Sequence, residues 1–402
     1  MIKKTTLVFA ALFGLVCVAK GQWQQVNNGL TDNYVHSLVV SGTNTFAGTN
    51  GGGVFLSASN GSNWTAVNNG LTTSDIWSFG ISGTYIFVGT VTDGVFLSSN
   101  NGNTWTPVNN GLTNTDVRSL ATSGGNIFAG TNGGTGGVFL STDTGNSWTA
   151  VNNGLTNNYV MSFAFIGTNI FAATWGGGVF LSNNNGNSWT PVNNGLADVS
   201  IHSLATSGTS IFAGGGSGVF LSVNNGSTWT AVNTGLTNLN VQSLTISGGN
   251  IFAGTWNGGV FLSSNNGSIW TAVNSGLTNL YIWSLALSST NIFAGTNGGG
   301  VFIRPLSEMV SIQPSINNHQ PSTIFPNPFT SSFTINYSLS ENGFVSLLLF
   351  DITGKLVSVI ANEKQTKGEH TVNYDGKNSA EGIYYYQLTT DEGTETKKIV
   401  KN

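Results

Sequence analysis

Tryptophan recurs through most of the chain at an interval of about 41 residues. The seven members of the series are Trp23, Trp64, Trp105, Trp148, Trp189, Trp229 and Trp270. Each interval holds four short segments bounded by Gly or Asn. In these segments apolar and polar residues alternate or β-branched residues are frequent, so we expect four strands per unit. Period and strand number together predict an all-β fold, a seven-bladed β-propeller.

The two ends of the repeat complement each other. Residues 23–26 resemble the fourth strand of a unit whose other strands are missing, whereas the last unit stops after a third strand at residues 300–303. We expect these two segments to pair, which would close the ring and remove its open edges. The alternative, a linear solenoid, would leave both part-units unpaired and would need polar caps.

Charge is scarce in the repeat region. Only 7% of all residues are charged, the formal net charge is −4, and Arg118 and Arg304 are the only cations between Trp23 and Leu306. Binding to a nucleic-acid backbone or to an anionic membrane needs a basic surface, so neither partner is expected.

The N-terminus has the pattern of an export signal. Lys3 and Lys4 precede an apolar run over residues 7–19, and Ala19-Lys20-Gly21 fits cleavage after residue 21. The run is too short for a membrane anchor, and Val16 is unsuited to precede a lipidated Cys17. Cys17 is the only cysteine, so the mature chain would have no disulfide, no thiol nucleophile and no Cys-based metal site. Cleavage would also remove the apolar run, so we expect no transmembrane segment in the mature chain.

The turn before each tryptophan carries a family resemblance. The turns read SASNGSNW, SSNNGNTW, STDTGNSW, SNNNGNSW, SVNNGSTW and SSNNGSIW. They resemble the Asp-box, or bacterial neuraminidase repeat, which also occurs in sortilin-like and photosystem-assembly-factor-like propellers, and the resemblance covers most of residues 23–304. In such a turn the Asx side chain accepts main-chain N–H groups, Gly supplies a positive φ and Trp packs between blades. A calcium site is the alternative, but each turn has at most one carboxylate, so a structural role is favoured. The positions assigned to this role are Asn60, Gly61, Trp64, Asn101, Gly102, Trp105, Asp143, Gly145, Trp148, Asn184, Gly186, Trp189, Asn224, Gly226, Trp229, Asn265, Gly267 and Trp270.

The sequence offers little for catalysis. A sialidase needs an arginine cluster for the substrate carboxylate, which two distant arginines cannot form. Other glycosidases need two carboxylates, but the repeats contain no Glu and only six Asp: Asp32, Asp75, Asp93, Asp116, Asp143 and Asp198. His36 and His202 are isolated, so we expect no metal and no cofactor. A hydrolase using Asp75, Asp116 and Arg118 remains an alternative.

Positions that differ from unit to unit are free to serve a ligand. They occur after the first apolar residue of the first strand, immediately before that residue, and in the loop between the second and third strands. In a four-stranded meander all three positions emerge at one end, around the mouth of the central channel. Aromatic side chains with amide and carboxylate neighbours suit sugar rings or extended peptides. The alternative is that they fill an irregular channel or drift neutrally. The candidate ligand-binding residues are Tyr34, His36, Asp75, Trp77, Asp116, Arg118, Tyr159, Met161, Trp175, His202, Gln242, Trp256, Tyr281 and Trp283. Asp93 shares the loop position.

Composition changes after Arg304. Residues 305–323 are expected to be a linker, and Lys and Glu return in residues 324–402, where strands are predicted over 333–337, 345–350, 370–373 and 383–388. A small Ig-like β-sandwich is expected. The segment resembles the type A C-terminal sorting domain of the type IX secretion system in the ordered motifs FPNPFTSSFTINYSL, VSLLLFDITGKLV, GEHTVNYDG, EGIYYYQL and KKIVKN. The alternative is an Ig-like binding module.

These features predict four parts: a signal peptide at 1–21, the propeller at 22–304, the linker, and the sorting domain at 324–402. The resemblance of the last part implies a Bacteroidetes source, recognition by the type IX machinery, passage through the periplasm, and a final location outside the cell or on its surface. The predicted function is non-enzymatic binding or adhesion to a glycan or peptide. A hydrolase or lyase at the same face and a structural surface-layer or assembly protein are the alternatives.

Overall fold

The computed structural model describes residues 22–310, 322–339, 342–352, 356–377, 379–390 and 393–402. The predicted signal peptide, including Cys17, lies outside these residues. The chain divides into two compact units, Met1–Val310 and Ser311–Asn402, and each is described by itself.

The described part of the first unit forms seven four-stranded antiparallel sheets, six of which are meanders of four consecutive strands. The first strands are β2 (Val35–Ser41), β6 (Ile76–Ser82), β10 (Val117–Ser123), β14 (Val160–Ile166), β18 (Ile201–Ser207), β22 (Val241–Ser247) and β26 (Ile282–Leu287). The second strands are β3 (Asn44–Thr49), β7 (Tyr85–Thr90), β11 (Asn126–Thr131), β15 (Asn169–Thr174), β19 (Ser210–Gly215), β23 (Asn250–Thr255) and β27 (Asn291–Thr296). The third strands are β4 (Val54–Ser57), β8 (Val95–Ser98), β12 (Val138–Ser141), β16 (Gly178–Ser182), β20 (Gly218–Ser222), β24 (Gly259–Ser263) and β28 (Gly300–Pro305). The fourth strands have two residues each: β5 (Thr65–Ala66), β9 (Thr106–Pro107), β13 (Thr149–Ala150), β17 (Thr190–Pro191), β21 (Thr230–Ala231), β25 (Thr271–Ala272) and β1 (Gln24–Gln25).

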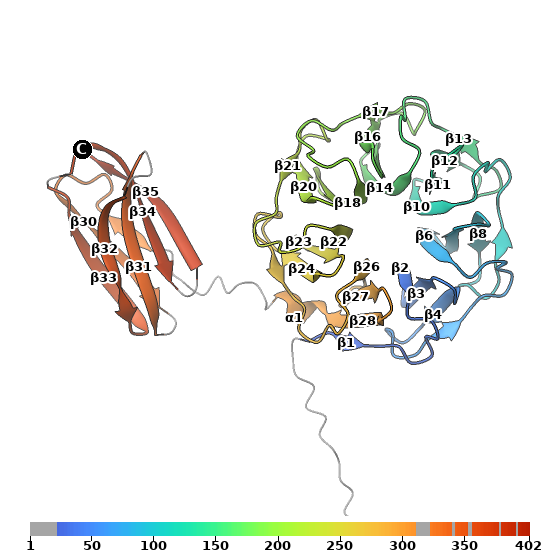
Figure 1. Ribbon diagram of the computed structural model, residues 1–402, viewed down its shortest axis with the longest axis horizontal. Helices are drawn as coiled ribbons and strands as arrows, with labels where there is room; N and C mark the ends of the chain where they lie inside the picture. The colour runs from blue at the N-terminus through green and yellow to red at the C-terminus, as the bar shows by residue number, and fades with distance from the viewer. Residues whose placement is uncertain (1–21, 311–321, 340–341, 353–355, 378, 391–392) are drawn as a thin grey trace, which may run out of the picture. The chain divides into compact units, whose positions relative to one another are not determined.

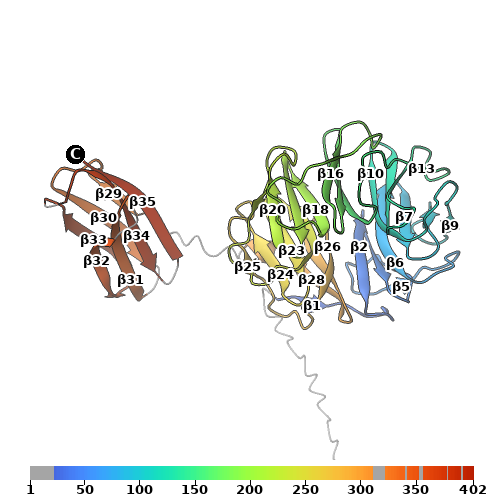
Figure 2. The same ribbon diagram turned by 45° about the horizontal axis from the view of Figure 1, so that its top comes forward.

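The sheets are arranged around a central axis (Figure 1). Each first strand contacts the first strands of both neighbouring sheets, and the series returns from β26 to β2. The sheet that contains β26 takes its fourth strand from the other end of the unit, because β1 pairs with β28 and places Gln24 opposite Ile303. Figure 2 shows β1 and β28 together again after a 45° turn.

The hydrophobic core lies between neighbouring sheets. One cluster combines Val35, Phe55 and Trp64 of the β2–β5 sheet with Phe293 and Val301 of the sheet that contains β1. Each repeat tryptophan is at least 96% buried, and each indole N–H donates a 2.7 Å hydrogen bond to a valine carbonyl of the adjacent sheet. The tryptophans therefore fasten one sheet to the next through both packing and a directional bond.

The turns before the tryptophans have the predicted chemistry, with one shift of register. In the turn before Trp105, Asn100 Oδ1 accepts the Thr104 N–H at 2.9 Å, and Asn101 has a φ of +56°. The acceptor in the turn before Trp64 is Ser59, and Asn60 has a φ of +52°. The assignment of Asn60 and Asn101 as acceptors is therefore wrong by one residue, whereas Asp143, Asn184, Asn224 and Asn265 accept as predicted.

A buried serine that the sequence reading did not single out completes each of these turns. Ser98 Oγ accepts the Gly102 N–H at 2.8 Å and donates to Asn100 Oδ1 at 3.0 Å. The serine at this position also accepts the turn glycine's N–H in the five other turns: Ser57, Ser141, Ser182, Ser222 and Ser263. Arg304 occupies the corresponding place at the end of β28.

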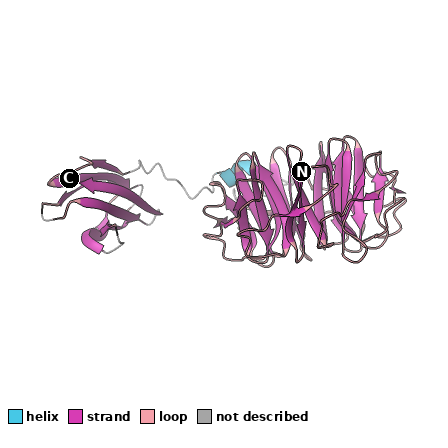
Figure 3. Ribbon diagram, turned by 90° about the horizontal axis from the view of Figure 1, so that it is seen from above, coloured by secondary structure: helices cyan, strands magenta, loops and turns pink. Residues whose placement is uncertain are grey.

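Part of the segment expected to be a linker belongs to the first unit. β28 extends to Pro305, and α1 (Leu306–Val310), drawn in cyan in Figure 3, follows it directly. The Leu306 N–H donates to the Thr290 carbonyl at 2.8 Å, and Met309 is fully buried. This hydrogen bond and the buried Met309 side chain hold the segment against the first unit, which its Pro and Asn content did not reveal.

The second unit contains two antiparallel sheets that share one core. The first has the order β29 (Thr323–Phe325), β30 (Ser332–Leu339) and β33 (Gly368–Asp375); the second has the order β32 (Leu356–Gln365), β31 (Gly343–Asp351), β34 (Gly382–Thr390) and β35 (Gly393–Lys401). Phe333 and Ile335 from one sheet are buried with Leu347, Tyr386 and Ile399 from the other. All four predicted strands are present, and β29, β32 and β35 were not predicted.

Candidate functional site

A β-bulge occurs at the same place in every first strand. In β2 the register shifts between Val35 and Ser37, which leaves His36 as an extra residue opposite β3. A bulge bends the strand and redirects its side chain. The seven bulged residues are His36, Trp77, Arg118, Met161, His202, Gln242 and Trp283. They form the first variable set found in the sequence, and we call them the bulge ring.

The other two variable sets are joined to each other by the main chain. Isolated bridges connect the residue before a first strand to the loop between the second and third strands of the preceding sheet. Trp175 bridges Ser200, and Trp256 bridges Tyr281. These bridges bring the three sets to one end of the ring, as the meander connectivity predicts.

A cavity of about 320 Å³ lies at this end. Its lining combines six bulge-ring residues with residues from the two other positions: Trp77, Arg118, Met161, His202, Gln242, Trp283, Asn132, Trp175, Asn240 and Trp256. Trp175 is 57% exposed at its mouth. We call this cavity the mouth cavity. Its volume is at the lower end of the range for small-molecule sites, and its lining is mainly apolar.

A second cavity of about 240 Å³ lies along the first strands. The same six bulge-ring residues line it, together with His36 and a series of serines that includes Ser37, Ser119 and Ser203. Because those six side chains line both cavities, they lie where the two cavities meet, and we call this level the floor of the mouth cavity.

Close ring contacts hold one side of this floor. The His36 imidazole lies 4.4 Å from the Trp77 ring and 5.3 Å from the Trp283 ring, and the two indoles are edge to face at 5.7 Å. Trp256 packs edge to face on Trp283 at 5.0 Å and on Tyr281 at 5.1 Å. Contacts at these distances and angles are favourable for aromatic rings and restrain each ring's orientation.

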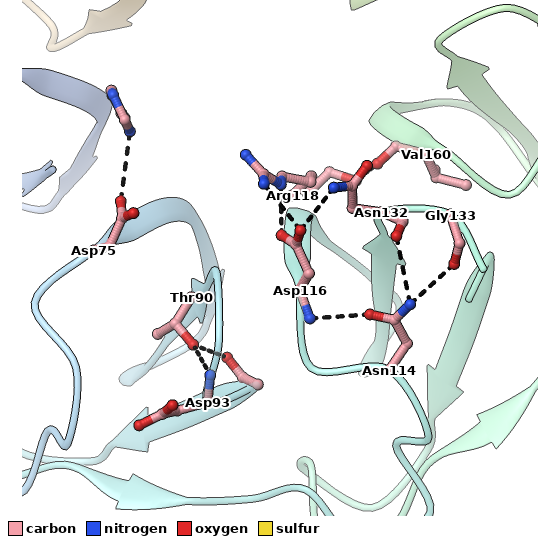
Figure 4. A network of polar contacts seen from close by, with 12 residues as sticks. Asp75, Thr90, Asp93, Asn114, Asp116, Arg118, Asn132, Gly133 and Val160 are labelled. Atoms are coloured by element: carbon pink, nitrogen blue, oxygen red, sulfur yellow. Dashed lines mark hydrogen bonds and ion pairs between the residues drawn. The ribbon is translucent and has the colours of Figure 1, made fainter. Parts of the chain in front are cut away.

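Arg118, the one cation in the lining of the mouth cavity, is paired with a carboxylate outside that lining. Arg118 Nε lies 2.5 Å from Asp116 Oδ1, and its NH2 group donates to Asp116 Oδ2 at 2.9 Å. Asn132 also donates to Asp116, at 2.7 Å, and Figure 4 shows Asp116 between Arg118, Asn132 and Asn114. The guanidinium carbon lies 4.0 Å from the centre of the Trp77 ring. Arg118 is thus held by its partners before any ligand arrives.

Titration near the floor is shifted toward neutral forms. Burial, assisted by the charge of Arg118, lowers the pKa of His36 to about 4. Its Nδ1 lies 3.8 Å from Asp75 Oδ1. Burial raises the pKa of Asp75, which the Trp77 indole and Arg118 oppose. Burial also lowers the pKa of His202, whose Nδ1 lies 3.2 Å from the Val241 carbonyl. Both histidines are therefore neutral at pH 7.

Eight of the fourteen candidate residues line the mouth cavity. His36 lines only the second cavity. Asp75 and Asp116 line neither cavity, but they lie next to His36 and Arg118, respectively. Tyr281 packs on Trp256. Tyr34 and Tyr159 are 50% and 43% exposed. Asp93 lies outside both linings and is hydrogen-bonded to Thr72, which lowers its pKa.

Asn132 and Asn240 line the mouth cavity without being candidates. Asn132 has the loop position that Trp175 and Trp256 have in their sheets, and Asn240 immediately precedes a first strand. The comparison of repeats places Asn240 in the variable set before the first strands, and the same comparison at the loop position would have found Asn132.

Comparison with known proteins defines the class of each part. Residues 323–402 match the family described as "Secretion system C-terminal sorting domain". The chain as a whole resembles solved structures that contain β-propellers. The protein is thus an all-β, propeller-like molecule followed by a sorting domain, which implies export to the cell surface or the extracellular space.

Three solved structures illustrate the likeness. PorZ, an essential surface component of the type-IX secretion system of Porphyromonas gingivalis, is 16% identical with a TM-score of 0.58, over 93% of this chain and 60% of that one. The extracellular domain of a hybrid two-component system from B. thetaiotaomicron is 17% identical with a TM-score of 0.63, over 96% and 58%. YCF48 bound to D1 peptide is 14% identical with a TM-score of 0.56, over 71% and 94%. This chain spans about three fifths of the length of the first two, and identities this low establish only the fold.

No curated protein matches the sequence. Within the described residues, none of the helices has the length and apolar character needed to span a bilayer.

Proposed function

We propose that the protein is a binding protein exported by the type IX secretion system, which captures an extracellular glycan or peptide in the mouth cavity. In this proposal the first unit is a seven-bladed propeller closed by β1 and β28, residues 324–402 are an Ig-like sandwich, and residues 1–21 are the export signal. PorZ-like propeller neighbours and the sorting domain support a surface or extracellular location.

One observation supports binding above all. Eight of the fourteen candidate side chains that vary among otherwise uniform repeats line the mouth cavity, and six of these eight are bulged residues of the first strands. Tryptophans that repeat almost unchanged fasten neighbouring sheets elsewhere, and equally regular serines stabilise the turns. The variable residues are therefore available for recognition, and flat indoles such as Trp175 supply contact area at low conformational cost.

The carboxylates considered for hydrolysis are placed differently. Asp116 is fully engaged by Arg118 and Asn132, and neither Asp116 nor Asp75 lines the mouth cavity. Glycosidic hydrolysis needs two carboxyl groups flanking the bond. Binding without turnover is therefore the function that this arrangement supports.

The binding proposal can be tested with the full chain on glycan and peptide arrays and with an unbiased pull-down from the extracellular milieu. Trp175→Ala should abolish binding of a captured ligand, because the substitution removes the exposed indole at the mouth of the cavity. Tyr85→Ala is the matched control, since Tyr85 is a 39% exposed aromatic residue in the turn region at the opposite end of the sheet. Equal loss in both variants, or no effect of Trp175→Ala, would contradict the site.

Export is tested separately. Deleting residues 324–402 should leave the first unit in the periplasm, as judged by fractionation and immunoblotting against the full chain. Undiminished release of the shortened chain would refute sorting by this domain.

A further inference from the structure

We infer that the ligand of the mouth cavity is an uncharged, polyhydroxylated one, the terminal sugar of a neutral glycan chain that enters end-on. This inference rests on the proposed binding function and narrows it. It follows from the charges at the cavity, from the polar atoms left available, and from its volume.

The cavity offers no free charge to a ligand. Its lining has no Asp, Glu or Lys, and its one cation, Arg118, is paired at 2.5 and 2.9 Å with Asp116. His202 is neutral, because burial lowers its pKa. An acidic sugar or a peptide carboxylate would have to compete with Asp116 for Arg118, and a basic peptide would meet no carboxylate in the lining. A neutral ligand incurs neither cost.

The polar atoms that remain are both donors and acceptors. Asn132 uses Nδ2 to bind Asp116, which leaves Oδ1 as an acceptor. Gln242 donates Nε2 to Asn240 Oδ1 at 2.6 Å, which leaves Gln242 Oε1 as an acceptor and Asn240 Nδ2 as a donor. His202 directs Nδ1 to the Val241 carbonyl, so its proton lies on Nδ1 and Nε2 is an acceptor.

This pattern fits hydroxyl groups. A hydroxyl donates one hydrogen bond and accepts others, so a sugar can satisfy Gln242 Oε1, His202 Nε2 and Asn240 Nδ2 at once. The indoles of Trp175 and Trp256, in the same lining, provide the flat apolar surface that a sugar ring presents its C–H groups to. Amides and aromatic rings thus surround one polyhydroxylated ring.

The size of the cavity determines which part of a chain fits it. Trp77, Trp283 and His36 pack at 4.4 to 5.7 Å on one side of the bulge ring, at the place where the two cavities meet. At about 320 Å³ the cavity accepts a chain end, whereas a continuous chain would need an open groove.

The test measures binding of three sets of probes to the full chain by calorimetry: neutral linear oligosaccharides, uronic-acid or sialylated oligosaccharides, and short peptides. A cyclic neutral oligosaccharide of the same sugars serves as the probe without ends. We expect a neutral linear oligosaccharide to bind, Gln242→Leu to weaken it by about five- to tenfold through loss of one hydrogen bond, and Tyr85→Ala to leave it unchanged.

The outcomes separate this inference from the proposed function. If acidic sugars or peptides bind in preference and Trp175→Ala abolishes that binding, the binding function stands and the neutral-sugar inference is overturned. If the cyclic probe binds as well as the linear one, end-on entry is overturned. If no probe binds and the pull-down recovers nothing sensitive to Trp175→Ala, both fail.

Discussion

The indole N–H of Trp23 donates a 2.7 Å hydrogen bond to the carbonyl of Val273, which lies 250 residues further along the chain. The six other repeat tryptophans make the same bond to the adjacent sheet. The bond of Trp23 differs in that it joins the residue before β1 to the sheet of β22–β25, near the other end of the unit. Arg304 NH1 donates to the same carbonyl at 3.2 Å.

Trp23→Phe should therefore destabilise the ring at its junction. The change removes the indole hydrogen bond, worth about 1 kcal/mol, together with part of a buried side chain. β1 has only two residues and pairs with β28 from the other end of the unit, so we expect faster hydrogen exchange in β26–β28. Trp148→Phe is the control, because it loses an equivalent bond to Val108 from a strand held by sheets on both sides. Unchanged exchange in β28 would count against the junction.

The buried turn serines should matter more than their neighbours. Ser98→Ala leaves the Gly102 N–H without its acceptor, and we expect a loss of about 1–3 kcal/mol in the free energy of unfolding. Ser99→Ala is the same substitution one residue later on an exposed side chain, and it should cost little. Chemical denaturation of both variants compares them, and equal stabilities would contradict the role of Ser98.

Acid sensitivity should depend on Asp143. Its carboxylate accepts hydrogen bonds from Ser147 and Ser141, which lower its pKa below the ordinary value of 3.8. A carboxyl whose pKa is lower in the folded state stabilises the fold fully above its unfolded pKa, and that contribution is lost as pH falls through the folded pKa.

Asp143→Asn should accordingly flatten the dependence of the melting temperature on pH below about 4, with little change at pH 7, since Asn184 makes the same turn. The reciprocal change, Asn184→Asp, should steepen it. Identical acid profiles for the wild type and both variants would show that the turn carboxylate contributes nothing.

The last lysines of the chain should differ in their effect on sorting. Lys401 is buried, and its ammonium donates to the carbonyls of Gly376 and Lys377. Lys398 is exposed. Lys401→Ala should destabilise the sorting domain by about 1.5–3 kcal/mol, because charge-assisted bonds are lost, and reduce export. Lys398→Ala should leave the fold intact. Protease resistance and the secreted fraction report the two effects, and poor export of a protease-resistant Lys401→Ala would indicate direct recognition instead.

Much of the fold could be predicted because the repeats state the same pattern several times. A run such as residues 117–123 is extended and apolar in every unit, so the strands of the sheets were identified together. The turn acceptors were less certain at Asn100 and Asn101, since Asn favours both the acceptor position and the positive φ that follows it. β32 was missed because its polar and exposed residues lack a clear period.

The sequence could nominate residues for the candidate site, but it could not give their geometry. Variation among repeats selected Trp77 and Gln242, but a bulge depends on how two strands register, which neither strand reveals alone. The pairing of Arg118 with Asp116 two residues earlier is likewise a result of the bulge's local bend. From the sequence alone, without knowledge of this pair, Arg118 would be expected to bind an acidic group of a ligand.

The pairing of Gln24 with Ile303 also has a consequence in time. β1 finds its partner only when β28 exists, so these two strands cannot pair before residues 300–305 have been synthesised. Because β28 comes shortly before the sorting domain, a chain in which β1 and β28 are paired has been synthesised almost as far as that domain. Prematurely ended chains would keep an open sheet and lack the signal for release.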